Sequence, residues 1–296
     1  MIRSTRRVEA PKLRAYLSNV ALVHTQCRLH AVKNARVVNE DIMLERGFVR
    51  AGGVSRPVMT ILLAGVARVS AYGEHHWLAP GDALVVDAKQ EVHMRQAGEA
   101  YEAIAFEWSP AFLGSPRAQI DRAGLSADEL EEARAVWTAA RDERHAPARV
   151  VERLCAMLGK KPTASLDERV PERAQDLTHV LDAALSALAK QPMLDELSER
   201  LGVSTRQLNR IVRVYNETYG FNATGWIDTR NRRRLLIGAT LMTAPNATAS
   251  YVARVVGYQS ATAFARALGL ARLPAPTDIA AEVARIGDET MFPSNA

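Results

Sequence analysis

Two segments in the last third of the chain repeat one pattern of apolar, small and glycine residues, with their glycines 55 positions apart. In Met193–Tyr215, leucines recur at helical spacing up to Gly202, and Ser204 then begins a second apolar helical face. In Ala249–Leu268, Gly257 stands at the corresponding break. Glycine accepts the left-handed conformation that ends one helix before the next begins. Both segments are therefore typical of a helix-turn-helix unit.

The second helix of the first unit, expected over residues 205–216, is amphipathic. The residues predicted to face inward are Leu208, Ile211 and Val212. The residues predicted to face outward are polar or basic: Arg206, Asn209, Arg210 and Arg213. In a helix-turn-helix unit such a face enters the major groove of DNA. Similar spacing also occurs in helical cores, but two such units in one chain favour DNA binding.

The second unit repeats the arrangement with a turn that is one residue longer. The residues predicted to face inward are Val252, Val256, Phe264 and Leu268, and Tyr258 is expected to fill the turn. The following helix is expected to begin near Ser260 and to expose Ala261, Thr262, Ala265 and Arg266. A hairpin is excluded because both flanks have helical periodicity.

A long helix is predicted over residues 227–242, between the two units. It carries the sequence RNRRRLL, and Arg230, Arg233 and Arg234 fall on one side of it. This basic side has three interpretations: a solvated face, contacts with DNA phosphates, or ion pairs with the flanking units.

Positive charge is concentrated in the same third of the chain. Residues 191–285 contain twelve arginines, no lysine and seven acidic residues, a net charge of +5, which equals the net charge of the whole chain. The choice of arginine can reflect genome composition, since the whole chain has only six lysines. The clustering of charge permits a polyanionic partner such as double-stranded DNA.

The first third of the chain predicts short β-strands separated by Gly and Pro. They are expected at 58–63, 66–72, 83–87, 91–94 and 102–108. Regular short strands of this kind suggest a sandwich or barrel. The sequence Ser126-Ala-Asp-Glu129 fits a capping box that begins a helix, and Pro147 begins another that ends at Gly159. These two helices either cover an open sheet face or pair with a second copy as a dimer interface.

The expected organisation is α+β, with three parts. Residues 1–159 form a β domain with its two following helices, residues 160–171 form a linker, and residues 172–287 form an all-helical domain with two helix-turn-helix units. Further helices are predicted at 172–189, 193–201, 249–256, 260–268 and 278–286.

Four short sequences in the helical part, RLLIGATLM, VARVVGY, AFARAL and LPAP, stand in the order and spacing of a known family. Residues 172–286 resemble the DNA-binding domain of the AraC/XylS transcription regulators. The resemblance implies two helix-turn-helix units bridged by one long helix, with each recognition helix in an adjacent major groove on one DNA face. It also makes the β domain similar to the cupin-like sensor domain of many such regulators, on the sequence LAPGDALVV followed by His93.

The resemblance implies residue roles by position. Base-facing candidates are Arg206, Asn209 and Arg210 in the first unit and Ala261, Thr262 and Arg266 in the second, with Ser260 at the helix start. Arg213 is placed for phosphate, as are Arg233 and Arg234 on the bridging helix. Arginine can bind guanine with two hydrogen bonds, and threonine can contact a thymine methyl group. The second surface has few donors, so the first is expected to contribute more specificity.

The sequence departs from the family pattern in three places. The interval from Arg210 to Arg234 is longer than usual, so the connection between the units is expected to be reshaped. Gly269 stands where Lys is common, and Leu273 stands where Gly is usual.

The resemblance also implies partners, which are a small-molecule effector, a second copy of the chain and RNA polymerase. The effector would bind in the β domain, although dimerisation alone is the alternative role of that domain. No cofactor is expected.

A metal-dependent cupin enzyme fused to a helical domain is the alternative function. Its metal site needs a His-x-His pair with a following Glu and a later His. Residues 32–74 contain no histidine, Glu74-His75-His76 is expected at a turn, and His93 is a lone candidate. The chain also has no nucleophile-elbow, P-loop or dinucleotide motif, so an enzyme is not expected.

The remaining features of the chain are typical of a cytoplasmic protein. Cys27 and Cys155 are far apart and suggest free thiols in a reducing compartment. The apolar runs are too short for a membrane span, and the N-terminus does not have the pattern of a signal peptide.

Overall fold

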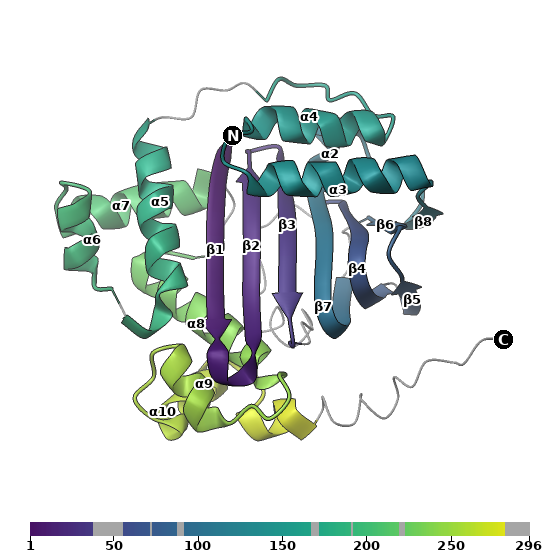
Figure 1. The fold of residues 1–296 in the computed structure, drawn as a ribbon. Helices are drawn as coiled ribbons and strands as arrows, with labels where there is room; N and C mark the ends of the chain where they lie inside the picture. The colour runs from purple at the N-terminus through teal and green to yellow at the C-terminus, as the bar shows by residue number, and fades with distance from the viewer. Residues whose placement is uncertain are drawn as a thin grey trace.

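The computed structural model describes residues 1–37, 56–71, 73–87, 92–166, 172–190, 192–218 and 223–281, without the side chains of 70–71, 92–99 and 172. An antiparallel sheet with two helices across one face forms the first part, and consecutive α-helices form the second (Figure 1). The predicted α+β organisation is confirmed. No helix of the described residues is long and apolar enough to cross a membrane.

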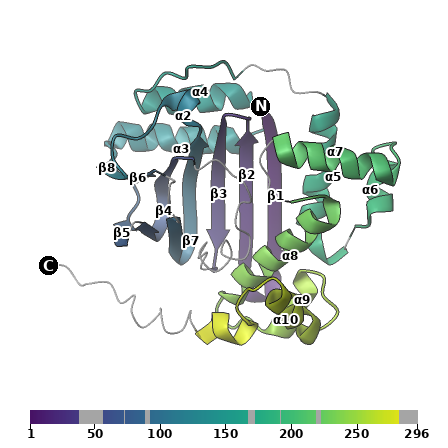
Figure 2. The ribbon, with the colours of Figure 1, turned by 180° about the vertical axis from the view of Figure 1, so that it is seen from behind.

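Eight strands form the sheet, in the order β1-β2-β3-β7-β4-β6-β8, with β5 also paired to β4. Their bounds are β1 Ile2–Ala10, β2 Ala15–Val23, β3 Cys27–Ala35, β4 Val58–Ala71, β5 Glu74–Leu78, β6 Asp82–Val86, β7 Val92–Trp108 and β8 Ile120–Gly124. All pairings are antiparallel. Strand β1 is therefore the edge strand that faces the helical part of the chain (Figure 2).

The first three strands were not predicted from the sequence. β1 alternates between buried and more exposed positions over most of its length, which is the pattern of a half-buried strand. The apolar alternation is weak in the sequence because Ser4 and Arg6 stand on the same face as Ile2, Val8 and Ala10. In β2 the last four residues are all buried, so no alternation remains to be seen there.

Two pairs of predicted strands are single long strands in the structure. The segments expected at 58–63 and 66–72 form β4, and those expected at 91–94 and 102–108 form β7; Tyr72 and Glu91 lie outside the described residues. The break expected at Gly65 is a β-bulge, where the register with β7 shifts between Leu62 and Val66. Gly65 has φ +85°, and a Cβ there would lie 2.4 Å from the carbonyl oxygen of Ala100.

Helices α3 (Ala127–Arg141) and α4 (Pro147–Met157) pack on one face of this sheet (Figure 1). The predicted capping box is confirmed: Ser126 Oγ accepts from the N–H of Glu129, and Glu129 Oε2 accepts from the N–H of Ser126. Trp137 Nε1 donates to the carbonyl of Val32, and Arg141 donates to the carbonyl of Ala31. Of the two alternatives for these helices, covering the sheet is thus the one observed within this chain.

Both cysteines lie in the apolar cluster between these helices and the sheet. Cys27 comes from β3 and Cys155 from α4, and both are free and buried. Burial raises the pKa of Cys27 to about 12 and that of Cys155 to about 11. Both thiols are therefore protonated at neutral pH and unreactive.

The predicted linker is packed against the sheet domain over its first half. Leu166 is 2% exposed and belongs to the same apolar cluster, and the N–H of Thr163 donates to the carbonyl of Phe112. A proline-containing segment without periodicity can be fixed by a single buried side chain, which periodicity does not detect. The rest of the predicted linker lies outside the described residues.

The helices of the second part lie close to their predicted positions. Their bounds are α5 Glu172–Ser186, α6 Leu194–Arg200, α7 Thr205–Thr218, α8 Trp226–Met242, α9 Ala249–Val255 and α10 Ala261–Leu270. The helix predicted at 278–286 begins earlier, at residue 276, and residues 282–286 lie outside the description. Helix α8 runs from the first unit beside α5 to the second unit beside the lower ends of β1 and β2 (Figures 1 and 2).

The bulge at Gly65 generates a stability prediction. We expect Gly65→Ala to cost about 2–4 kcal/mol, because a left-handed conformation and a clash with the Ala100 carbonyl add together. Gly73→Ala is the matched control: Gly73 has φ +80° but open space around it, so only the conformational cost of about 1–2 kcal/mol applies. Urea unfolding followed by tryptophan fluorescence measures both, and equal losses would contradict the close approach at Gly65.

Candidate nucleic-acid interface

The turn of the first helix-turn-helix unit is built by its own backbone and one capping box. Gly202 has φ +60°, and the N–H of Val203 donates to the carbonyl of Ser198, which closes the end of α6. Ser204 then caps α7, because its Oγ accepts from the N–H of Gln207 while Gln207 Oε1 accepts from the N–H of Ser204. The turn predicted at Gly202 and the cap predicted at Ser204 are confirmed. The hydrogen bond from the N–H of Ser204 to Gln207 was not predicted from the sequence.

Helix α7 buries one face and exposes the predicted polar residues. Leu208 and Val212 are fully buried together with Leu197 of α6. The four outward candidates are all exposed: Arg206, Asn209, Arg210 and Arg213. Arg213 lies 3.8 Å from Glu217, one turn further along the helix. Helix α7 therefore offers three arginines and one amide to solvent on one element.

The second unit has the same construction. Gly257 has φ +83°, and the N–H of Tyr258 donates to the carbonyl of Ala253 at 2.7 Å. Ser260 caps α10 by accepting from the N–H of Ala263. Phe264 and Leu268 are fully buried, as predicted. Thr262 and Arg266 are exposed and Ala261 is half-buried, so α10 exposes fewer polar groups than α7.

Arg234 has a different place from the one predicted. Its side chain is buried, and its Nε and Nη2 donate to the carbonyls of Val256 at 2.7 Å and Gly257 at 2.5 Å. Its guanidinium also lies over the ring of Tyr258, 4.0 Å from the centroid. Burial lowers the pKa of this guanidinium. Arg234 thus joins α8 to the turn of the second unit, and we remove it from the set of expected phosphate contacts.

A glycine brings α8 against α10, the second helix of the second unit. A Cβ at Gly238 would lie 2.7 and 2.8 Å from two ring carbons of Phe264 and 3.4 Å from Val256. The ring of Phe264 therefore packs directly on the backbone of α8, and the ring of Tyr258 packs against it at a tilt of 42°, with ring centroids 5.5 Å apart. Gly238 and Arg234 together fix α10 on α8.

Arg233 and Arg230 occupy intermediate positions on α8. Arg233 is half-buried, burial and the nearby Arg6 lower its pKa, and Asp182 opposes that shift. Arg230 Nη1 approaches the sulfur of Met193 at 3.9 Å. The charges near Arg233 come from Arg6 of β1 and Asp182 of α5, so this arginine lies on the β1–α5 side of α8. The phosphate contact predicted for Arg233 stays a prediction.

The longer connection between the units is partly taken up by α7. This helix extends to Thr218, two residues beyond its predicted end. After the undescribed residues 219–222, Thr224 N–H donates to Asp228 in the first turn of α8, and Asn216 Nδ2 donates to the carbonyl of Ala223.

The structure also explains why Leu273 can stand where glycine is usual. Leu273 is buried, and Arg272 before it takes the left-handed conformation with φ +58°.

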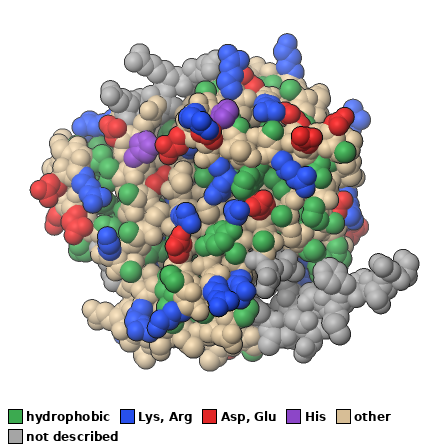
Figure 3. Space-filling view, in the orientation of Figure 1, with side chains coloured by type: hydrophobic (Ala, Val, Ile, Leu, Met, Phe, Trp, Pro, Cys, Tyr) green, Lys and Arg blue, Asp and Glu red, His purple; other side chains and the backbone are tan. Residues whose placement is uncertain are grey.

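Charge on the helical part is unevenly distributed. Figure 3 shows Lys and Arg side chains over α9 and α10 at the lower end of this face, and acidic side chains at the outer edge over α6. The exposed acids of α6 are Asp195, Glu196 and Glu199. A polyanion is repelled by this acidic edge and attracted to the arginines of α7.

The histidines of the β domain do not form a metal site in the described part of the chain. His75 and His76 lie on strand β5, which corrects the predicted turn, and the side chain of His93 lies outside the description. The described residues contain no group of three or more His, Cys, Asp or Glu side chains that could hold a metal ion.

Comparisons with known proteins found likenesses of structure only. No protein-family model matches the chain, and no curated protein sequence matches it. Similar solved structures include ToxT from Vibrio cholerae O395, with 10% identity, 88% of this chain and 99% of that chain covered, and a TM-score of 0.37. The AraC-like transcriptional activator CuxR has 13% identity, 75% and 79% coverage and a TM-score of 0.32.

A cupin domain of an XRE family transcriptional regulator from Enterobacter cloacae covers 29% of this chain and 84% of its own, with 10% identity and a TM-score of 0.23. All three TM-scores lie below 0.5.

The packing of α10 on α8 generates a second prediction. We expect Gly238→Ala to destabilise the second unit by about 1–3 kcal/mol, because the added methyl group displaces the ring of Phe264. Gly269→Ala on α10 is the control, since a Cβ there meets open space and alanine favours the helix by about 0.5–1 kcal/mol. Hydrogen exchange of the α9 and α10 amides measures both. Equal protection in the two variants would contradict the contact.

Proposed function

We propose that this protein is a sequence-specific, double-stranded DNA-binding transcription regulator. The observation that carries the proposal is the pair of helix-turn-helix units whose second helices, α7 and α10, expose polar side chains while α8 holds both units. An exposed polar helix that follows a tight glycine turn is the element that enters a major groove. The net charge of +5 on residues 191–285 supplies attraction to the phosphates.

Base recognition is assigned mainly to α7. Arg206 and Arg210 can each donate two hydrogen bonds to O6 and N7 of guanine, and Asn209 can bind adenine in the same bidentate way. Arg213, one turn beyond Asn209, is assigned to phosphate, and its exposed ion pair with Glu217 costs little to break. On α10, Thr262 and Arg266 are the exposed donors, with Ser260 and Ala261 at the helix start.

The sheet domain is assigned a regulatory role. We propose that it binds a small-molecule effector, mediates homodimer formation, or both, and that the regulator acts with RNA polymerase in the cytoplasm. Thermal-shift screening separates these roles: a compound that stabilises the protein and changes its DNA affinity supports an effector. Sedimentation of the intact protein gives the oligomeric state.

A non-catalytic function fits the described residues better than a cupin metalloenzyme. A metalloenzyme of that kind needs three protein ligands around one ion. His75 and His76 are adjacent on one strand, so their side chains point to opposite faces of the sheet. We therefore propose binding and regulation, without a cofactor, as the role of the chain.

Selection of DNA sites from a random pool, followed by gel-shift titration against scrambled competitor, tests the proposed function. We expect a specific site bound at least about 10³-fold more tightly than scrambled DNA. If no sequence is enriched and all DNA binds alike, the proposal is wrong.

The division of roles on α7 generates a third prediction. Arg210→Ala is expected to cost about 1–3 kcal/mol of binding to the selected site and to relax the preference at one base pair. Arg213→Ala, on the same helix and also exposed, is expected to weaken binding to all sequences and to lower the salt slope by about 1. Titrations at several salt concentrations separate the two. Equal losses on random DNA for both variants would contradict the division.

A further inference from the structure

We propose that Asp182 is a positioning residue: by tying α5 to the edge strand β1, it fixes how the two helix-turn-helix units are placed relative to each other. Its consequence for DNA recognition rests on the proposed function. The placement itself is a property of the protein alone and can be measured without DNA.

Strand β1 reaches the apolar cores of both units. Ile2, at its start, is buried in the cluster formed by α5, α6, α7 and Trp226 of α8. Val8 and Ala10, at its end, are buried in the cluster of the second unit, with Leu13 of the following turn. The N–H of Lys12 donates to Tyr251 Oη of α9 at 3.2 Å. One nine-residue strand therefore bridges the two units alongside α8.

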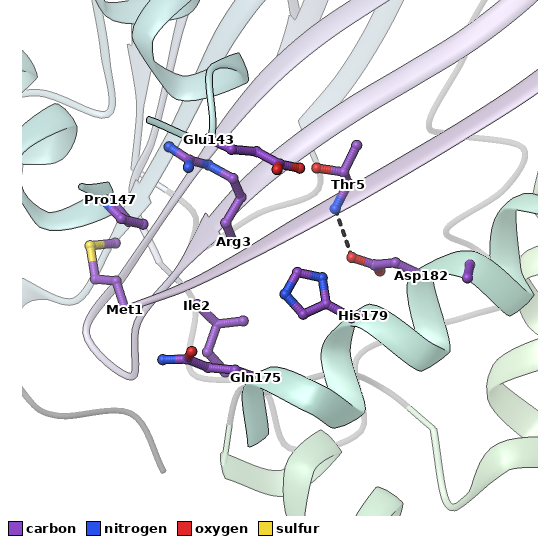
Figure 4. A pocket seen from close by; sticks show the side chains of 10 residues that line it. Met1, Ile2, Arg3, Thr5, Glu143, Pro147, Gln175, His179 and Asp182 are labelled. Carbon is purple, nitrogen blue, oxygen red and sulfur yellow. Dashed lines mark hydrogen bonds between the residues drawn. The ribbon is translucent and has the colours of Figure 1, made fainter. Parts of the chain in front are cut away.

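The middle of β1 is held by side chains of α5. Asp182 Oδ2 accepts from the N–H of Thr5 at 2.7 Å, and its Oδ1 accepts from Ser4 Oγ at 2.8 Å and Arg6 Nε at 3.0 Å. One helical turn further, Ser186 Oγ accepts from the N–H of Arg7 at 3.2 Å. Figure 4 shows Asp182 reaching from α5 to the backbone of β1.

The spacing of these contacts matches the two elements. Positions four apart on a helix are about 6 Å apart along its axis, and positions two apart on a strand are about 6.8 Å apart. Asp182 and Ser186 can thus meet Thr5 and Arg7 at the same time. These N–H groups belong to the edge strand of the described sheet, on the side away from β2. Side chains of α5 accept the hydrogen bonds of these edge N–H groups.

Charge makes Asp182 the critical member of this contact. Its side chain is 9% exposed and pairs with Arg6, whose side chain is 20% exposed. Asp182 also lies close enough to Arg233 of α8 to affect its pKa. Burial and the charge of Arg6 lower the pKa of Arg233, and the charge of Asp182 partly offsets that shift. Loss of the carboxylate therefore removes the ion pair with Arg6 and the hydrogen bonds to Ser4 and Thr5 together.

Apolar packing between α5 and β1 is incomplete near the start of β1. A cleft of about 490 Å³ opens between the start of β1, the turn between α3 and α4, and α5 (Figure 4). Arg3, Glu143 and His179 line it, together with Asp182. The hydrogen bonds of Asp182 and Ser186 therefore hold α5 against β1 where apolar contact is incomplete.

A second connection between the two units matters because α8 is a single helix. Two units joined by one helix can still tilt or turn when that helix bends. Strand β1 is fixed at both ends and in its middle, so it connects the two units a second time, beside α8. This second connection limits the tilting and turning of one unit relative to the other. Release of the middle contact should leave each unit folded and widen the range of their relative placements.

Paired spin labels measure that range directly. Val214 on α7 and Leu270 on α10 are exposed, at 51% and 79%, and can be replaced by Cys for labelling, while both native cysteines are buried. In the intact protein we expect a narrow distribution of label distances. Asp182→Ala is expected to broaden or shift it, and Asp176→Ala, an exposed acid on the same helix, is expected to leave it unchanged. Asp182→Asn, which keeps an acceptor oxygen without the charge, is expected to lie between them and replaces Asp182→Ala if that variant does not fold.

DNA binding provides the second readout. Selected sites are rebuilt with one or two base pairs inserted between the segments contacted by α7 and α10. The intact protein is expected to reject these sites, whereas Asp182→Ala loses most of this discrimination. If label distances and spacing preference are the same in Asp182→Ala and Asp176→Ala, the positioning role is overturned. If distances broaden but no protein binds a specific site, the positioning role stands and the proposed function fails.

Discussion

The placement of α10 depends on how Arg234 and Gly238 join it to α8. Arg234 is a buried cation whose charge is balanced by two backbone carbonyls and an aromatic ring. A buried charge is tolerated when such hydrogen bonds replace its water. The carbonyls belong to Val256 and Gly257, in the turn that directs α10. The direction of α10 is therefore coupled to the rotation of α8 about its own axis, and Gly238 allows the close approach that this coupling needs.

The first unit is anchored in a different way. Helix α5 binds the edge of the sheet through Asp182 and Ser186, and its apolar face is continuous with that of α6 and α7. Because β1 also enters the core of the second unit, the sheet and both helix-turn-helix units share one strand. A change in the sheet that moves β1 is transmitted to both units. The geometry thus gives a physical route from the sheet domain to the proposed DNA interface.

The sequence was most informative where one face of a helix is apolar and a glycine marks its end. Gly202, Gly257, Phe264 and the exposed arginines of α7 follow from periodicity and turn chemistry alone. Strand β1 was missed because Ser4 and Arg6 are polar and lie on the same face as the buried Ile2, Val8 and Ala10, where they bond to Asp182 of α5 and interrupt the apolar alternation. Arg234 was misplaced because helical periodicity separates faces but does not reveal which basic side chain has carbonyl partners from another element. Asp182 gave no local signal, since its partners are more than 170 residues away.

The most direct test of the account is a hydroxyl-radical footprint of the protein on its selected DNA site. If α7 and α10 act as two recognition helices held by α8 and β1, the footprint shows two protected tracts on one face of the duplex, about 10 base pairs apart for each protomer. The tract bound by α7 is the one whose sequence is more strictly selected. A single tract, or protection that is the same on every DNA sequence, would contradict the account.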